Sequence, residues 1–357
     1  MAFPTAAGYG NLPNGNFSPV IYSQKAQLAF RKKTTVGQIT NSEYMGEISK
    51  FGDTVKIIKE PEISVQAYAR GTNIEAQDLD DEDFTMVVDQ ANYFAFKTDD
   101  IEEAHAHHNW SAMASDRAGY RLADNHDQEV LAYMSGYKQT AKHAKGSTLN
   151  TAPSGTKAVS TAGANELLSS MQLKKGDFST ITTASAGDQS IPLAPRLPGI
   201  TALPTALISP VTLITRMKKL LDQQFVPSDG RYIVLDPTFL EMLGDEDSRF
   251  LNADFGESGA LRSGEAPTRI QGFRVYMSNN LPEVGAGPET AGTANQNTNY
   301  GVIIGGHEGA VATAEQIRKT ESYRDQHSFG DIVRGMHLYG RKILRPEAIV
   351  TAKYNVA

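Results

Sequence analysis

The sequence predicts an α+β fold, in which a strand-rich part, one long helix and a mixed helix–strand part follow one another along 357 residues. β-branched and aromatic residues dominate residues 51–97, which favours strands. Residues 101–142 contain no proline, and beyond residue 200 apolar residues at helical spacing alternate with short apolar runs. Because 40% of the residues are hydrophobic, the chain can bury the core of one large or two modest domains.

Residues 1–42 have the composition of an extended arm. Pro4, Pro13 and Pro19 disfavour both helix and strand, although Gln24–Lys33 could form a short helix. This stretch carries a formal charge of +4, whereas residues 43–104 carry -11. Such an asymmetry indicates contact with a charged neighbour, and a solvated tail is the simpler alternative for this feature alone.

Residues 51–97 predict a long β-hairpin with a charged tip. The expected strands are Thr54–Ile58, Glu62–Tyr68, Phe84–Val88 and Tyr93–Phe96. Between them, Arg70–Asp83 forms a long and acidic turn. Since an isolated hairpin is only marginally stable in water, we expect it to lie on a neighbouring molecule.

The long helix is predicted from Ile101 to about Lys142. Asp99 and Glu102 have the spacing of a capping box at its start, and acidic residues in the first turn favour the helix dipole. Some 40 residues would span about 60 Å, which is typical of a structural spine rather than of an ordinary globular helix.

The C-terminal half predicts helices and strands in alternation after a linker at Gly146–Lys157. Ser209 and Asp236 are each followed by a proline, which is the pattern of a capped helix start. The expected strands are Arg231–Leu235, Phe273–Met277, Tyr300–Ile304, Ala310–Ile317 and Lys342–Tyr354.

The sequence predicts no catalytic residue, no cofactor and no metal site. With no cysteine, the chain has no disulfide, cysteine-ligated metal or catalytic thiol. His307–Glu308 begins a zinc-protease pattern, but Val311 stands where the second histidine is needed. His105 and His108 could share a helix face, and Asp78–Asp83 could bind calcium; ordinary surface residues are the better interpretation of both. No apolar stretch approaches the ~20 residues of a membrane helix, and no secretion signal is present, so we expect a soluble chain without a membrane partner.

The order of elements and several short motifs resemble the Hong Kong 97-type capsid fold of tailed phages, especially the coat proteins of short-tailed podoviruses. The stretches that carry the resemblance cover most of residues 45–357 and are Tyr68–Gly71, Ile74, Leu79, Tyr93–Phe96, Asp99–Glu102, Phe225–Pro227, Arg231–Pro237, Gly272–Val275, Tyr339–Arg341 and Leu344–Ala348. The resemblance implies an N-terminal arm (1–42), peripheral-domain strands (43–98) with an extended loop at about 58–87, a spine helix (99–145), an axial domain (146–330) and C-terminal return strands (331–357).

The resemblance also implies a function. The chain would be a non-enzymatic major capsid protein that assembles as hexamers and pentamers into an icosahedral shell enclosing double-stranded DNA. It would assemble in the bacterial host cytoplasm and reside in the virion. Its partners would be other copies of itself, a scaffolding protein, a portal protein at one vertex and packaged DNA through non-specific contacts; whether a decoration protein binds is left open. The expected inter-subunit contacts are Arg31, Lys32, Lys33, Tyr68, Arg70, Asp78, Asp80, Asp81 and Asp83.

Three alternatives make different predictions. An encapsulin-like compartment shares the fold but encloses protein cargo, so packaged DNA would exclude it. An α/β enzyme would be a monomer or small oligomer with a ligand-filled pocket. Decoration and scaffolding proteins are usually shorter or more helical.

The sequence lacks the long helical N-terminal extension that some relatives use as a built-in scaffold, which implies a separate scaffolding protein. It marks no lysine–asparagine pair for covalent cross-linking.

Overall fold

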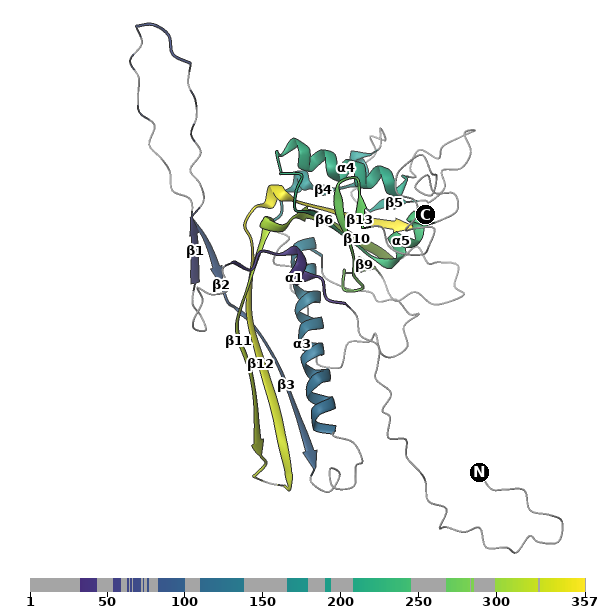
Figure 1. Cartoon of the computed structure of the whole chain (residues 1–357). Helices are drawn as coiled ribbons and strands as arrows, with labels where there is room; N and C mark the ends of the chain where they lie inside the picture. The colour runs from purple at the N-terminus through teal and green to yellow at the C-terminus, as the bar shows by residue number, and fades with distance from the viewer. Residues whose placement is uncertain are drawn as a thin grey trace, which may run out of the picture.

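In the part of the chain that the structure describes, the main elements are three β-sheets and one long helix (Figure 1). The computed structural model describes residues 33–43, 54–58, 63, 65, 67–71, 73, 76, 83–99, 110–137, 166–178, 190–193, 208–244, 268–282, 284–285, 299–326 and 328–356. The mixed helix and strand content confirms the predicted class. Within this part of the chain, no helix is long and apolar enough to span a membrane.

The largest sheet has mixed strand directions. Its main path runs β4-β13-β10-β6-β8-β7, with β5 paired to β13 and β9 paired to β10. Strands β10 and β6 are antiparallel, whereas β6 and β8 are parallel. The strands are β4 (Gln172–Leu173), β5 (Ile191–Leu193), β6 (Arg231–Leu235), β7 (Arg269–Ile270), β8 (Phe273–Met277), β9 (Val284–Gly285), β10 (Asn299–His307) and β13 (Ile349–Val356).

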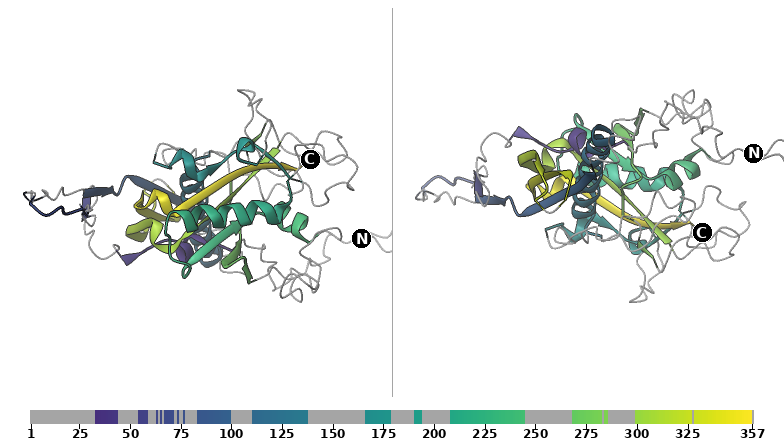
Figure 2. Two further views of the ribbon diagram at one scale, coloured as in Figure 1. Left: turned by 90° about the horizontal axis from the view of Figure 1, so that it is seen from above. Right: turned by 90° about the horizontal axis from the view of Figure 1, so that it is seen from below.

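Helices cover this sheet and bury most of the core. Helix α4 (Pro210–Gln223) lies across it and packs next to α5 (Pro237–Leu243), as Figure 1 and Figure 2 show. Leu213, Met217 and Leu221 recur at helical spacing on α4 and are fully buried, as amphipathic periodicity requires. The remaining short helical turns are η4 (Ser169–Met171), η5 (Lys175–Asp177), η9 (Glu308–Ala310) and η10 (Pro346–Ala348).

A second sheet of three antiparallel strands continues directly from the first. Its order is β11 (Val311–Arg324), β12 (Gly330–Ile343) and β3 (Gln90–Asp99). The turn η9 joins β10 to β11, and η10 lies between β12 and β13. The antiparallel pair β10–β13 therefore extends into the pair β11–β12, so the two sheets share continuous backbone.

The long helix α3 (Trp110–Ser135) runs beside the three-stranded sheet (Figure 1). Its C-terminal residues Val130, Leu131 and Met134 enter the main core. The helix ends at Ser135 rather than near Lys142 as predicted, because Gly136 adopts a left-handed conformation (φ 73°) and its N–H closes the last turn on Ala132 O. Residues 101–109 lie outside the described part, and Asp99, expected as the cap, is the last residue of β3.

The hairpin and the end of the predicted arm complete the fold. Strands β1 (Thr54–Ile58) and β2 (Asp83–Val87) pair antiparallel and form the base of a projecting loop (Figure 1). The predicted strand Glu62–Tyr68 is wrong, since the described positions in that range belong to no strand. Helix α1 (Val36–Ile39) is buried against α3, so the last residues of the expected arm belong to the core.

Other local predictions have clear outcomes. The predicted strands at 54–58, 231–235 and 273–277 are confirmed, and so are both helix starts. At α5, Asp236 accepts a hydrogen bond from Phe239 N (3.2 Å) as a true cap, whereas Ser209 makes no side-chain cap bond at α4. The single strand expected at Lys342–Tyr354 is interrupted at η10, where Pro346 has no N–H to continue a ladder.

Candidate interaction surfaces

Three of the predicted contact residues have described side chains, and all three lie on the surface. Lys33 and Arg70 are exposed, and so is Tyr68. The backbone of Asp83 pairs with Ile58 at the base of the loop. Arg31, Lys32, Asp78, Asp80 and Asp81 lie outside the described residues. The structure therefore leaves the proposed basic and acidic partners untested against each other.

The projecting loop carries apolar side chains that its own chain does not cover. Val65 is 97% exposed, and Ile63 and Tyr68 are also exposed. Three large apolar side chains in one short stretch exceed the scattered exposure that is normal for a monomer surface. They are suited to contact another molecule.

The outer face of the three-stranded sheet is a second candidate surface. Tyr93 on β3 is 81% exposed and pairs across the strand with Met336 of β12, which is also exposed. Nearby, the Arg334 guanidinium lies 5.0 Å from the Tyr323 ring and bonds the Glu321 carboxylate at 2.8 Å. This face combines aromatic, apolar and paired charged groups, which is the composition of a protein contact surface.

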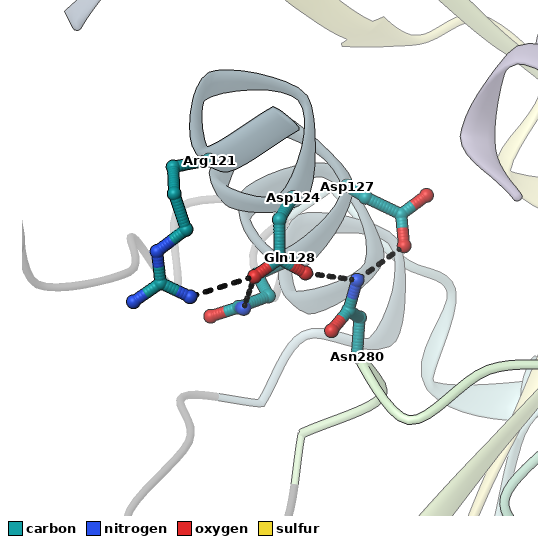
Figure 3. Close-up of polar contacts among 5 residues, drawn as sticks. All are labelled: Arg121, Asp124, Asp127, Gln128 and Asn280. Carbon is teal, nitrogen blue, oxygen red and sulfur yellow. Dashed lines mark hydrogen bonds and ion pairs between the residues drawn. The ribbon is translucent and has the colours of Figure 1, made fainter. Parts of the chain in front are cut away.

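A buried cluster of carboxylates and amides holds together the elements that carry these surfaces (Figure 3). The Oδ1 of Asp127 accepts hydrogen bonds from the N–H groups of Thr35 (2.7 Å) and Val36 (2.8 Å). The Nδ2 of Asn280 donates to Asp127 Oδ2 (2.8 Å) and to Asp124 Oδ1 (2.9 Å). One helix thus holds the N-terminal segment and the loop that follows β8.

The electrostatics of this cluster are those of a structural group. Burial raises the pKa of Asp127, whereas the hydrogen bonds from Val36, Asn280 and Thr35 oppose that shift. On the other side of the cluster, Gln128 and Arg121 contact Asp124 Oδ2 at 3.2 and 3.5 Å (Figure 3). Each carboxylate oxygen therefore has a donor, so the cluster is satisfied as it stands.

A second buried pair ties α3 to the three-stranded sheet. Arg341 Nη1 lies 3.4 Å from Glu129 Oε2, and both side chains are buried. The Tyr339 hydroxyl donates to the same carboxylate, and Asn92 Nδ2 donates to the Tyr339 oxygen at 3.3 Å. These contacts join β12 and β3 to the helix through groups that would be costly to bury unpaired.

The described residues offer no arrangement for catalysis by a metal. Within them, no group of three or more histidine, aspartate or glutamate side chains could hold an ion. His307 Nδ1 accepts a hydrogen bond from Gly309 N (3.1 Å), and Val311 is buried, so the failed zinc-protease pattern is a turn. His105 and His108 lie outside the described part.

Sequence reasoning missed the residues that organise these surfaces. Asp127 and Asn280 are 153 positions apart, so no local pattern predicts their contact. One signal was available: Asp124 and Asp127 stand at i, i+3 beside Val130 and Leu131, on the part of the helix that turned out to be buried. A pair of acids on an apolar helix face indicates polar partners from elsewhere in the chain.

The solved structures that are similar to this chain agree on one fold. No protein-family model and no curated protein matches the sequence. Among solved structures, a chain from Mycobacterium phage Che8 is 22% identical, with 95% of this chain and 97% of that chain covered and a TM-score of 0.64. A chain from the capsid of cyanophage P-SCSP1u is 19% identical (96% and 93% covered, TM-score 0.62). A chain from the capsid of Ralstonia phage GP4 is 13% identical (99% and 99% covered, TM-score 0.62). Over almost its whole length, the chain therefore has the fold of phage capsid proteins.

Proposed function

We propose that the chain is the major capsid protein of a tailed bacteriophage. Its copies assemble as hexamers and pentamers into an icosahedral shell that encloses double-stranded DNA. The observation that carries this proposal is the whole-length similarity to capsid chains, 99% of both chains in the case of the GP4 capsid. The subunit is structural and not an enzyme, is part of the virion, and assembles in the host cytoplasm.

In this proposal the fold is of the Hong Kong 97 type. The three-stranded sheet with α3 is the peripheral domain, and the eight-stranded sheet with α4 and α5 is the axial domain. The loop between β1 and β2 is the extended loop, which lies over an adjacent copy. Its exposed Ile63, Val65 and Tyr68 support this assignment, because a neighbouring subunit would bury them.

The proposed partners follow from the same assignment. A separate scaffolding protein directs assembly, a portal protein occupies one vertex, and the packaged DNA makes non-specific contacts. The basic residues Arg31, Lys32 and Lys33 meet either the acidic loop residues Asp78, Asp80, Asp81 and Asp83 of a neighbouring copy or the DNA, since opposite charges attract in both cases.

Charge reversal tests this role of the basic residues. The triple variant R31E/K32E/K33E should yield few closed shells, or shells that lose DNA. The control variant R31K/K32R/K33R keeps every charge and should assemble as the wild type does. The readouts are sedimentation of particles and nuclease-protected DNA. Full yields of DNA-filled particles from the charge-reversed chain would contradict the assignment of these three residues.

A further inference from the structure

A cavity lies between helix α3, the three-stranded sheet and the N-terminal segment. Its volume is about 430 Å³, which is room for a few large side chains. Helix α3 contributes Gly119 and Ala123, strand β12 contributes His337, and the segment after Lys33 contributes Thr34, Val36 and Gly37.

Two glycines keep this space open at a cost to the fold. Gly119 lies inside α3, and apart from its own turn of the helix no atom of the described residues lies within 4 Å of the position that a Cβ would take. Gly37 in α1 is equally open. Alanine would fit at both positions and would favour the helix, because glycine gives up more conformational freedom on folding. The chain thus forgoes stability at two walls of the same cavity.

A buried histidine at the cavity lacks hydrogen-bond partners. His337 is only 4% exposed, and among the described residues neither ring nitrogen has a hydrogen bond. The nearest carboxylate oxygen, on Glu315, is 3.7 Å from Nε2, beyond hydrogen-bond range. Buried polar groups in folded proteins are almost always paired. An occupant with peptide donors and acceptors would satisfy this imidazole.

The nearest available occupant is the chain itself. The described structure begins at Lys33, and Thr34 already lines the cavity, so the preceding residues start at its mouth. These residues include Leu28 and Phe30, which are apolar and large enough to fill the space. Phe30 is four positions from Thr34 and can reach at most about 14 Å from it. A covalent link this short gives the segment a high effective concentration at the cavity.

We propose that the cavity is the docking site for the chain's own residues 24–32, with Leu28 and Phe30 as the side chains that fill it. Their peptide groups would meet His337. Docking would set the direction in which residues 1–23 leave the subunit and would leave the side chains of Arg31, Lys32 and Lys33 at the surface, free to contact a neighbouring copy or DNA. Docking is a property of the isolated subunit. The segment can fail to dock although the chain forms capsids, and it can dock although the chain forms none.

Disulfide trapping tests the docking, because the chain has no native cysteine that could form a competing disulfide. The double variant A29C/G119C places one thiol beside Phe30 and one in the cavity wall. The control A29C/G176C uses another open glycine that does not line the cavity. Under mild oxidation, the first pair should form an intrachain disulfide at least about ten times faster than the control. Equal rates, or disulfides between chains only, would overturn the proposal.

Filling the cavity provides an independent measurement. In G119L the new side chain should displace the segment, so that trypsin cleaves at Lys25 and Arg31 about tenfold faster than in the wild type. G119A adds one methyl group to open space and should be cleaved at the wild-type rate. Circular dichroism checks that both variants fold. Equal cleavage of the wild type and G119L would show that nothing is docked there.

Discussion

Replacing Asp127 with alanine should release the N-terminal segment from α3. The carboxylate accepts two backbone hydrogen bonds, from Thr35 (2.7 Å) and Val36 (2.8 Å), and one from Asn280 (2.8 Å). Without it, two buried N–H groups lose their acceptor, whereas the Asn280 amide loses one of two acceptors and keeps Asp124 Oδ1. The variant therefore removes the link between α3 and the N-terminal segment and weakens the link to the loop after β8.

The magnitude follows from these three bonds. Hydrogen bonds to a charged group each contribute about 1.5–3 kcal/mol, but burial of the carboxylate offsets part of this, as its raised pKa indicates. Leaving a buried neutral donor unsatisfied costs about 1–3 kcal/mol, and D127A leaves two such N–H groups, so we expect it to lose about 2–6 kcal/mol. D127N keeps an oxygen for both N–H groups but turns its amide toward that of Asn280, so it should lose only about 1–2 kcal/mol.

Urea denaturation followed by circular dichroism measures the loss, and amide hydrogen exchange at Val36 locates it. The control is E321A, which removes an exposed carboxylate paired with Arg334 and should leave the free energy of unfolding close to that of the wild type. A loss below about 1 kcal/mol for D127A, with Val36 exchange unchanged, would refute the role assigned to this cluster.

Three further predictions concern pH, backbone strain and packing. Burial raises the pKa of Asp127 above its ordinary 3.8, so its stabilising contribution is present below pH 3.8 and is lost as the pH rises through the folded-state pKa. The free energy of unfolding of the wild type should therefore exceed that of D127N by less as the pH rises. A difference that stays constant across urea titrations at several pH values would count against this. Phe225, which is 93% exposed, and Gln271 both have a left-handed backbone (φ 57° and 51°), which strains any residue other than glycine. F225G and Q271G should therefore each stabilise the isolated subunit by about 0.5–1 kcal/mol. A lower Tm for either variant would be inconsistent with strain at that position. G335A would place a Cβ against the Phe94 ring, which would have to shift, and should lose about 1–3 kcal/mol, which an unchanged Tm would disprove.

Local signals predicted the elements whose shape is set within a few residues. The proline after Ser209 and the capping carboxylate of Asp236 mark α4 and α5 because helix starts depend on neighbours in sequence. The short strand Arg231–Leu235 is buried at every position, and after Arg231, which pairs with Asp222, it is an uninterrupted run of aromatic and aliphatic residues. In contrast, the local pattern does not predict β12, since glycines and charged residues interrupt it and its pairing with β3 is entirely long-range; strands at 331–357 were implied only by the family resemblance.

The interaction surfaces were predicted only in part. Tyr68, expected at an inter-subunit contact, is exposed, and its contact with another copy stays a prediction. Tyr93 was assigned to a strand, but the face it occupies depends on the register with Met336, which only the folded sheet defines. The Asp127–Asn280 contact depends on where α3 crosses the loop after β8, so it required the three-dimensional fold.

Electron cryomicroscopy of the chain, expressed with its genomic neighbours, tests the central claim most directly. We predict closed icosahedral shells of hexamers and pentamers in which the loop between β1 and β2 lies on an adjacent copy and buries Val65. A discrete small oligomer that never polymerises, even with a scaffolding protein present, would contradict the capsid function.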